Sequence, residues 1–217
     1  MAPIELDVWV DLVCPLCYVA KRRLAAAVAS SAHPAEVSVT YRSFELDPQC
    51  PRGGDGSAVA QLARIQDVTE DQAMAALQSV ATDARPDGIV MDVAAMRPAN
   101  TLDAHRVLAI GRATGGLALQ SAVLERLFAA QFAEGKAVDD PAVLLRLGAE
   151  AGIDERLLAA VLSSDEYIEE VRRDERAAAE LGITTVPFIL TNGRVASSGP
   201  QTVEGFSRLI GITSGPM

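Results

Sequence analysis

Hydrophobic positions follow different patterns along the chain, and the first stretch predicts a β-α-β unit. Residues 4–13 (IELDVWVDLV) are mostly apolar and rich in β-forming residues, which predicts a buried strand. Apolar residues then recur at helical spacing from Cys17 to Val28, which predicts a helix with one buried face. Residues 37–41 (VSVTY) alternate apolar and polar side chains, as a half-buried strand does.

The middle of the chain is Ala-rich and has helical periodicity as far as about residue 181. It follows a loop, residues 47–57, that is rich in Pro and Gly. Thr69 and Gln72 fit a capping box at the start of one helix. Asp140 precedes Pro141 at the start of another helix, which Gly152 is placed to end.

The end of the chain returns to β-structure. The segments PFILT and RVASS flank Asn192-Gly193, the strongest short signal for a hairpin, and TVEGFSRLI predicts a final helix. Neither β-containing end can bury a sheet alone, so we expect both ends to form one sheet. The predicted fold class is α/β with a large inserted all-helical domain. Its expected boundaries are 1–55 and 176–217 for the two parts of the core, and 56–175 for the helical insertion.

Composition and charge exclude several classes of partner. The chain has 217 residues, of which 49% are hydrophobic, and its net charge is −10, which argues against nucleic acid or an anionic membrane as partner. No apolar run reaches the roughly 18 residues of a membrane span. The N-terminus lacks a basic segment, and acidic residues interrupt its apolar run, so we expect no signal peptide and a cytoplasmic protein.

Two of the three cysteines, Cys14 and Cys17, lie three positions apart where the first helix is predicted to begin. A zinc clip, a structural disulfide and a redox-active dithiol are the alternatives. Structural zinc needs four ligands, and the remaining Cys50, His33 and His105 form no second close pair, so we expect no metal. Structural disulfides are rare in the cytoplasm. A C-x-x-C motif that follows a strand and opens a helix favours redox chemistry.

Thiol-disulfide exchange requires one thiolate that solvent can reach and a second thiol that resolves the mixed disulfide. We expect Cys14 at the exposed tip of the helix, where free N–H groups and the helix dipole favour negative charge. We expect Cys17, one turn later, to face the core and to act second.

Far along the chain, Pro187 marks either a strand start or a cis-proline turn. In the second case the backbone of Val186 could pair with a substrate held against Cys14.

Four further residues have expected roles, and for some of them two interpretations stay open. Asp11, three positions before Cys14, could raise the pKa of a thiol or accept its proton, or it could simply hydrogen-bond the backbone. His105 is predicted to be packed or on the surface rather than catalytic. Cys50 is predicted to be an unpaired loop thiol, with a reactive third thiol as the alternative. Tyr18 is predicted to pack at the rim of the site.

These motifs together resemble the DsbA-like branch of the thioredoxin superfamily, and more narrowly the FrnE-type dithiol oxidoreductases, relatives of 2-hydroxychromene-2-carboxylate isomerase. The resemblance runs nearly end to end, through DLVCPLCYVAKRRL, RPANTLDAHRVLAIG, AAQFAEGKAVDD and GITTVPFIL. It implies a thioredoxin core with an inserted helical domain. It also implies that Cys14 attacks, that Cys17 resolves, and that Pro187 is the cis-proline after Val186.

The chain departs from the family pattern where substrate is expected to bind. The dipeptide between the cysteines is Pro15-Leu16 rather than Pro-Trp, and Thr185 replaces the usual Gly before Val-Pro. By this resemblance the substrate-binding residues are Pro15, Leu16, Thr185, Val186 and Pro187. The isomerase relatives look like glutathione users and have a serine at the position of Cys14, so two cysteines favour disulfide exchange here.

The sequence therefore predicts a thiol-disulfide oxidoreductase or isomerase that acts on protein or small-molecule thiols and disulfides. We expect no bound cofactor, with glutathione as a candidate thiol partner. The alternative function is a glutathione-dependent isomerase or transferase on the same fold. A third hypothesis is a chaperone or scaffold whose function does not need the two thiols. The sequence leaves the oligomeric state open.

Overall fold

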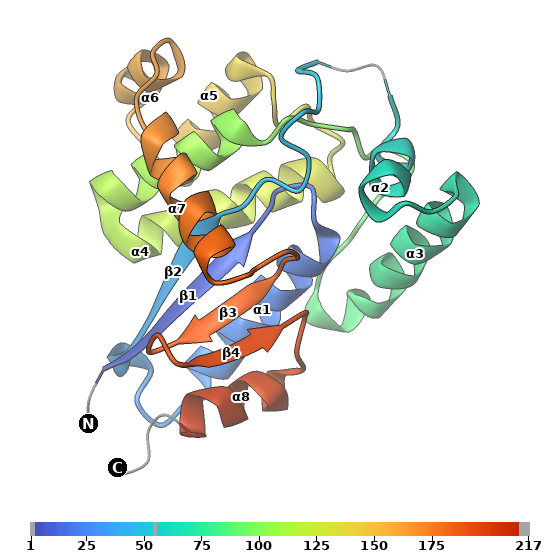
Figure 1. The fold of residues 1–217 in the computed structure, drawn as a ribbon. Helices are drawn as coiled ribbons and strands as arrows, with labels where there is room; N and C mark the ends of the chain where they lie inside the picture. The colour runs from blue at the N-terminus through green and yellow to red at the C-terminus, as the bar shows by residue number, and fades with distance from the viewer. Residues whose placement is uncertain (1–2, 54–55, 213–217) are drawn as a thin grey trace.

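The structure is a computed structural model that describes residues 3–53 and 56–212 (Figure 1). Four strands and eight α-helices make up most of the described chain, with short 3-10 turns at Pro34–Glu36 and Arg85–Asp87. In chain order the elements are β1 (Ile4–Val10), α1 (Pro15–Ala29), β2 (Val37–Ser43), α2 (Ala58–Gln66), α3 (Glu70–Asp83), α4 (Leu102–Phe132), α5 (Pro141–Ala151), α6 (Glu155–Leu162), α7 (Ile168–Glu180), β3 (Phe188–Thr191), β4 (Val195–Ser198) and α8 (Val203–Ile212).

The two ends of the chain form one mixed sheet with the strand order β2-β1-β3-β4. β1 runs parallel to β2, and β3 is antiparallel to both β1 and β4. The three-residue loop between β3 and β4 places Asn192 and Gly193 at φ 50° and 65°, the left-handed conformations typical of tight hairpin turns. The predicted single sheet and the predicted hairpin are therefore both confirmed.

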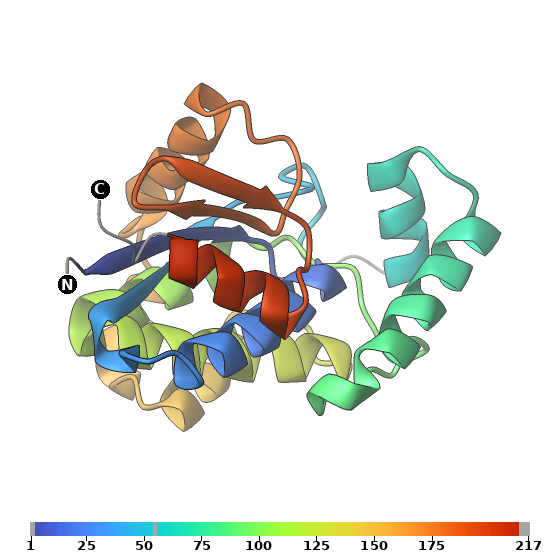
Figure 2. The same cartoon turned by 90° about the horizontal axis from the view of Figure 1, so that it is seen from below.

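Helices cover both faces of this sheet. Figure 2 shows α1 and α8 on one face and α7 on the other. Helix α7 is tied to the sheet by polar bonds as well as by packing. The indole N–H of Trp9 donates to the carbonyl of Asp174 over 3.0 Å, and the backbone N–H of Ser43 donates to the Asp174 carboxylate over 3.1 Å. The expected boundary at residue 175 falls within α7, and the division into domains stays a prediction.

The longest helix, α4, passes beside the sheet as a core element. Gly115 and Gly116 leave the helical conformation and kink it. Among the described residues, α4 is the one helix long and apolar enough to cross a membrane by length and composition. Many of its side chains, including Phe128 and Phe132, are buried against the rest of the protein. Burial inside the protein accounts for the apolar composition of this helix.

Helices α2 and α3 form a hairpin beside the N-terminal end of α1, and both views place it at the edge of the molecule (Figures 1 and 2). The capping box of Thr69 and Gln72 is present at the start of α3, as predicted. The Asp140 side chain caps α5, and Gly152 ends this helix at φ 109°. These local signals fix where the helices start and stop, whereas the position of the hairpin depends on packing.

Candidate functional site

Cys14 is the N-cap residue of α1, and Pro15 is the first residue of the helix. After β1 ends, a tight turn places the backbone N–H of Cys14 3.2 Å from the carbonyl of Asp11. The N–H of Cys17 then donates to the Cys14 carbonyl over 3.0 Å. Because the first N–H groups of a helix have no earlier partners in it, the Cys14 side chain lies where negative charge is favoured.

The two cysteines differ in burial less than predicted. Cys17 is fully buried, as expected, but Cys14 is only 6% exposed, so the expectation of an exposed tip is wrong. The reason is tertiary. The α2–α3 hairpin and the Thr184–Val186 segment line the same cavity as Cys14, so the tip of α1 does not face open solvent. A partner must therefore reach Cys14 through a recess.

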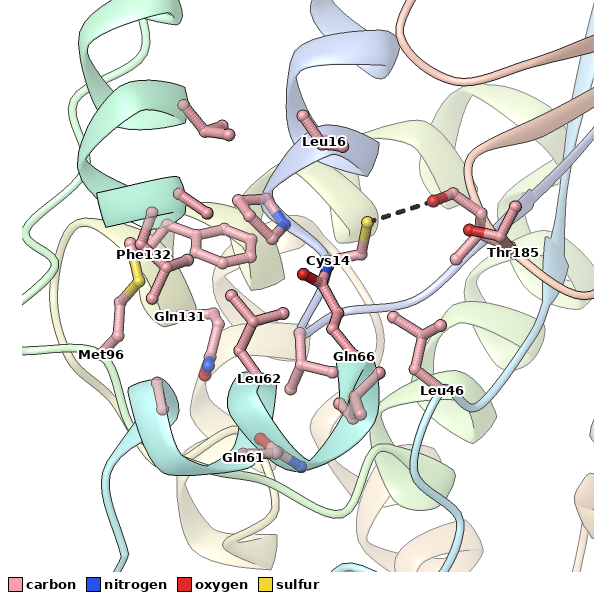
Figure 3. Close-up of a pocket in the computed structure, with 18 of the residues that line it drawn as sticks. Cys14, Leu16, Leu46, Gln61, Leu62, Gln66, Met96, Gln131, Phe132 and Thr185 are labelled. Atoms are coloured by element: carbon pink, nitrogen blue, oxygen red, sulfur yellow. Dashed lines mark hydrogen bonds between the residues drawn. The ribbon is translucent and has the colours of Figure 1, made fainter. Parts of the chain in front are cut away.

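The Cys14 sulfur lies against the segment before β3. Its thiol donates to the carbonyl oxygen of Val186 at 3.5 Å, the dashed contact in Figure 3. The Val186–Pro187 peptide bond is cis. Thr185 stands beside this contact in Figure 3. The structure thus brings together the two segments that the sequence pattern singled out, although their assignment as substrate-binding residues stays a prediction.

Cys17 lies behind Cys14 in the interior, and both are free thiols in this structure. Burial raises the pKa of the Cys17 thiol well above its usual value. The adjacent Cys14 side chain raises this pKa further, whereas the backbone of Asp11 lowers it and the Asp11 carboxylate raises it. Cys17 is therefore a neutral thiol at neutral pH.

Asp11 and His105 form a buried pair beneath the cysteines that sequence reasoning did not find. Both side chains are fully buried, and the His105 Nε2 lies 3.4 Å from the Asp11 Oδ1. The Asp11 carboxylate accepts backbone N–H bonds from Leu12 at 2.6 Å and from Leu46 at 2.7 Å. The backbone-bonding interpretation of Asp11 is therefore correct, and the packed interpretation of His105 holds. Neither residue gives a local signal of this long-range pairing.

The remaining candidates lie outside the centre of the site. Cys50 is 5% exposed, and its sulfur faces the carbonyl of Pro51 at 3.7 Å. Among the described residues, no cluster of three or more His, Cys, Asp or Glu side chains could hold a metal ion. Tyr18 stacks on Phe128 and donates to Glu125 at 2.7 Å, which gives it a packing role between α1 and α4.

A cavity of about 280 Å³ opens next to Cys14. Figure 3 shows its walls, which come from the start of α1, the α2–α3 hairpin, the end of α4 and the segment before β3. Pro15, Leu16, Thr185 and Val186 all contribute to its lining. Pro187 follows Val186 but is not among the lining residues. A reactive sulfur, a backbone carbonyl and an apolar cavity are thus adjacent, the arrangement expected of a thiol-exchange site.

Comparison with known proteins identifies the family. The model of the DSBA-like thioredoxin domain matches residues 5–211. The chain belongs to the DSBA-like thioredoxin family. The DsbA-like prediction is therefore confirmed, and so is the predicted α/β thioredoxin fold with helices between its two parts. The narrower FrnE-type assignment stays a prediction. No curated protein gives a significant match to the chain.

Solved structures of this DSBA-like fold include oxidoreductases and an isomerase. A probable DsbA oxidoreductase from Streptomyces coelicolor is 31% identical, with a TM-score of 0.89, and the match covers 99% of this chain and 92% of that one. A 2-hydroxychromene-2-carboxylate isomerase is 21% identical with a TM-score of 0.65, and the match covers 97% of this chain and 93% of that one.

A third structure is the cytosolic disulfide reductase DsbM from Pseudomonas aeruginosa, solved with GSH. It is 18% identical to this DSBA-like chain, with a TM-score of 0.65, and the match covers 97% of this chain and 98% of that one. At these identities the isomerase and DsbM share the fold and carry no further conclusion. The family and its oxidoreductase neighbours support a redox enzyme in general.

Proposed function

We propose that the protein is a thiol-disulfide oxidoreductase that works through Cys14 and Cys17. The observation that carries this proposal is the placement of the two thiols. One sulfur caps α1 beside a cavity and the Val186 carbonyl, and the other is buried one turn further along. The family and the oxidoreductase neighbour from S. coelicolor support the same chemistry. We propose that the protein acts in the cytoplasm, where reducing conditions restore the Cys14–Cys17 dithiol.

The reaction has two steps that balance electrons and protons. The Cys14 thiolate attacks one sulfur of a substrate disulfide, and the other sulfur leaves with the bonding pair and takes up a proton from solvent. Cys17 then loses its proton and attacks the Cys14 sulfur. The bond between Cys14 and the substrate breaks, the second substrate thiolate leaves, and the Cys14–Cys17 disulfide forms. The substrate is reduced by two electrons, and the reverse sequence oxidises a dithiol.

A redox titration tests the proposal independently of any substrate. The purified protein is equilibrated in mixtures of reduced and oxidised dithiothreitol, its free thiols are alkylated, and labelled peptides are identified by mass spectrometry. We expect Cys14 and Cys17 to lose label together in one reversible two-electron transition, while Cys50 remains labelled at every ratio. A pair that never becomes linked would overturn the proposal.

The glutathione-dependent isomerase is the alternative on the same fold. It requires that glutathione binds saturably and that turnover of a small substrate survives when the two thiols cannot form a disulfide. A Cys14→Ala/Cys17→Ala double variant that keeps such turnover would favour it. The scaffold hypothesis predicts instead that this double variant retains every function of the protein while the wild type shows no thiol turnover.

A further inference from the structure

Among the described residues, the cavity beside Cys14 has no charged side chain in its lining. Its described walls are mainly aliphatic and include Leu62 and Ile65 of α2 and Leu77 of α3. Its polar side chains are glutamines and threonines, and no Lys, Arg, His, Asp or Glu lines it. A charged group placed here would lose water without gaining an ion-pair partner, which is strongly unfavourable. The cavity therefore selects against charged ligands.

Two nearby arginines do not change this conclusion. Arg64 lies on α2 next to lining residues, but its guanidinium makes two bonds to the Asp47 carboxylate, at 2.9 Å and 2.5 Å. Arg97 follows the lining residue Met96, and its side chain is exposed and outside the lining. Glutathione has two carboxylates and one ammonium group, so it would find no side-chain counter-charge among the lining residues.

The two buried glutamines of the wall offer little polar recognition to a ligand. Gln131 of α4 is 1% exposed, and its Nε2 donates to the carbonyl of Arg97 at 2.7 Å. Its Oε1 is buried and has no hydrogen-bond partner. Gln61, in contrast, is fully engaged with Asp47 and the backbone of Ala99. Because the Gln131 oxygen is shielded from the cavity as well, we expect a ligand to be held mainly by apolar contacts.

The recess also limits the size of the partner. Only 6% of Cys14 is exposed, and the α2–α3 hairpin stands beside it. A cavity of about 280 Å³ lies at the lower end of the range for small-molecule sites, so it suits a compact ligand better than a long stretch of peptide. A small disulfide can enter this recess whole, whereas a peptide must lift α2 and α3 away from α1 or leave its flanking residues outside.

We propose that this cavity binds the uncharged, apolar group of a low-molecular-weight disulfide and presents its sulfur to Cys14 in preference to glutathione. The inference rests on the proposed function and names its substrate class. In the first step the Cys14 thiolate attacks the sulfur that bears the apolar group. The disulfide bond breaks, and the other sulfur leaves with the electron pair. The substrate disulfide is itself the oxidant, so no further reagent is required.

Three matched disulfides test the preference. Each joins 2-thiopyridine to a different thiol: benzyl thiol, glutathione, or a short peptide whose cysteine has leucine neighbours. Attack on the non-pyridyl sulfur releases pyridine-2-thione, which is followed by its absorbance. Each rate constant is divided by that of dithiothreitol with the same reagent, which removes differences in intrinsic reactivity. We expect the normalised constant for the benzyl reagent to exceed both others by about tenfold or more.

A charge placed in the cavity should reverse the order. Leu62 is half-buried in the wall, and Leu62→Lys should lower the benzyl rate and raise the glutathione rate, so that their ratio falls at least about tenfold. The matched control is Leu157→Lys on α6, where the leucine is 41% exposed and far from the lining set, and it should leave the ratio unchanged. If Leu62→Lys does not fold, Ile65→Lys makes the same change one turn along α2.

The outcomes separate the inference from the proposed function. Equal normalised rates for benzyl and glutathione reagents, or a faster peptide reagent, would overturn the inference while the dithiol mechanism stands. An unchanged ratio in a folded Leu62→Lys or Ile65→Lys variant would overturn it as well. If the wild type releases no more pyridine-2-thione than Cys14→Ser with any reagent, the proposed function itself is wrong, and the inference that rests on it is wrong as well.

Discussion

The sulfur of Cys14 lies 3.5 Å from the carbonyl oxygen of Val186, a residue 172 positions later in the chain. The contact joins the start of α1 to the segment that leads into β3. These two segments are neighbours because β1 and β3 pair in the sheet, with Trp9 opposite Phe188 in the register. A sulfur held at a helix N-terminus thus has a backbone acceptor on one side and a cavity on the other.

Substitution of each cysteine should separate the two chemical steps. We expect Cys14→Ser to reduce disulfide exchange to background, because the attacking sulfur is lost. We expect Cys17→Ser to accumulate a mixed disulfide between Cys14 and the substrate, because nothing resolves it. Mass spectrometry of the intact protein after reaction with the benzyl reagent measures both outcomes. Cys50→Ser is the control and should behave as the wild type. Exchange that survives in Cys14→Ser would contradict the assignment.

The resolving step should accelerate as the pH rises. Burial raises the pKa of Cys17 above its usual value, and this cause persists when Cys14 is bonded to the substrate, so at neutral pH Cys17 is almost entirely a neutral thiol. Below a pKa, the thiolate fraction grows about tenfold for each pH unit, and only the thiolate attacks. We therefore expect the resolution rate to rise about tenfold per unit between about pH 6 and 8.

A pH-jump experiment measures this dependence directly. The mixed disulfide at Cys14 is formed at low pH, where resolution is slow, and thiol release is followed after the jump. A resolution rate that is independent of pH would show that Cys17 already exists as thiolate, or that another event limits the step.

Replacement of Asp11 should have two separable effects. Its carboxylate accepts the backbone N–H groups of Leu12 and Leu46 in the interior, so Asp11→Asn should lower the free energy of unfolding by about 2–3 kcal/mol. Its negative charge raises the pKa of Cys17, so the same variant should shift the pH profile of resolution to lower pH. Urea denaturation and the pH-jump measurement test the two effects.

Asp83→Asn, at the exposed end of α3, is the matched control for Asp11→Asn. It should leave both the urea midpoint and the pH profile of resolution unchanged. A profile that does not move in a folded Asp11→Asn variant would leave Asp11 with its structural role alone.

Replacement by alanine should lower the free energy of unfolding by different amounts at two glycines with positive φ. Gly135 has φ 59°, and an added Cβ would lie 2.5 Å from the carbonyl oxygen of Ala95. Gly88 has φ 72° and nothing within 4 Å of such a Cβ. We expect Gly88→Ala to lower the free energy of unfolding by about 1 kcal/mol through backbone strain alone, and Gly135→Ala by about 3 kcal/mol. Equal urea midpoints for the two variants would contradict the close approach at Ala95.

Local sequence signals predicted much of the secondary structure because their causes are local. Asn192-Gly193 adopts positive φ at both positions, and a hairpin follows from that geometry alone. Thr69 and Gln72 satisfy each other's backbone partners within one turn of helix. Pro15 lacks the N–H that a first helical residue does not need, so α1 begins there.

The burial of Cys14 was predicted incorrectly because it depends on residues distant in the chain. The motif shows that this thiol caps a helix, and a helix tip by itself is exposed. The α2–α3 hairpin covers it only because aliphatic side chains such as Leu62 and Leu77 pack towards α1. The pairing of Asp11 with His105 has the same origin, since α4 places the imidazole beneath β1 through packing that spans 94 positions of sequence.

By itself, the sequence determined the dithiol, the order of strands and helices, and the points at which most of them begin and end. Each of these follows from φ/ψ preferences, capping or periodicity over a few residues. Only the tertiary structure decided which side chains surround the reactive sulfur, and hence that its cavity is uncharged and recessed. Those neighbours come from six separate segments of the chain. Burial of apolar surface brings them together, and it does not depend on how close the segments are in the sequence.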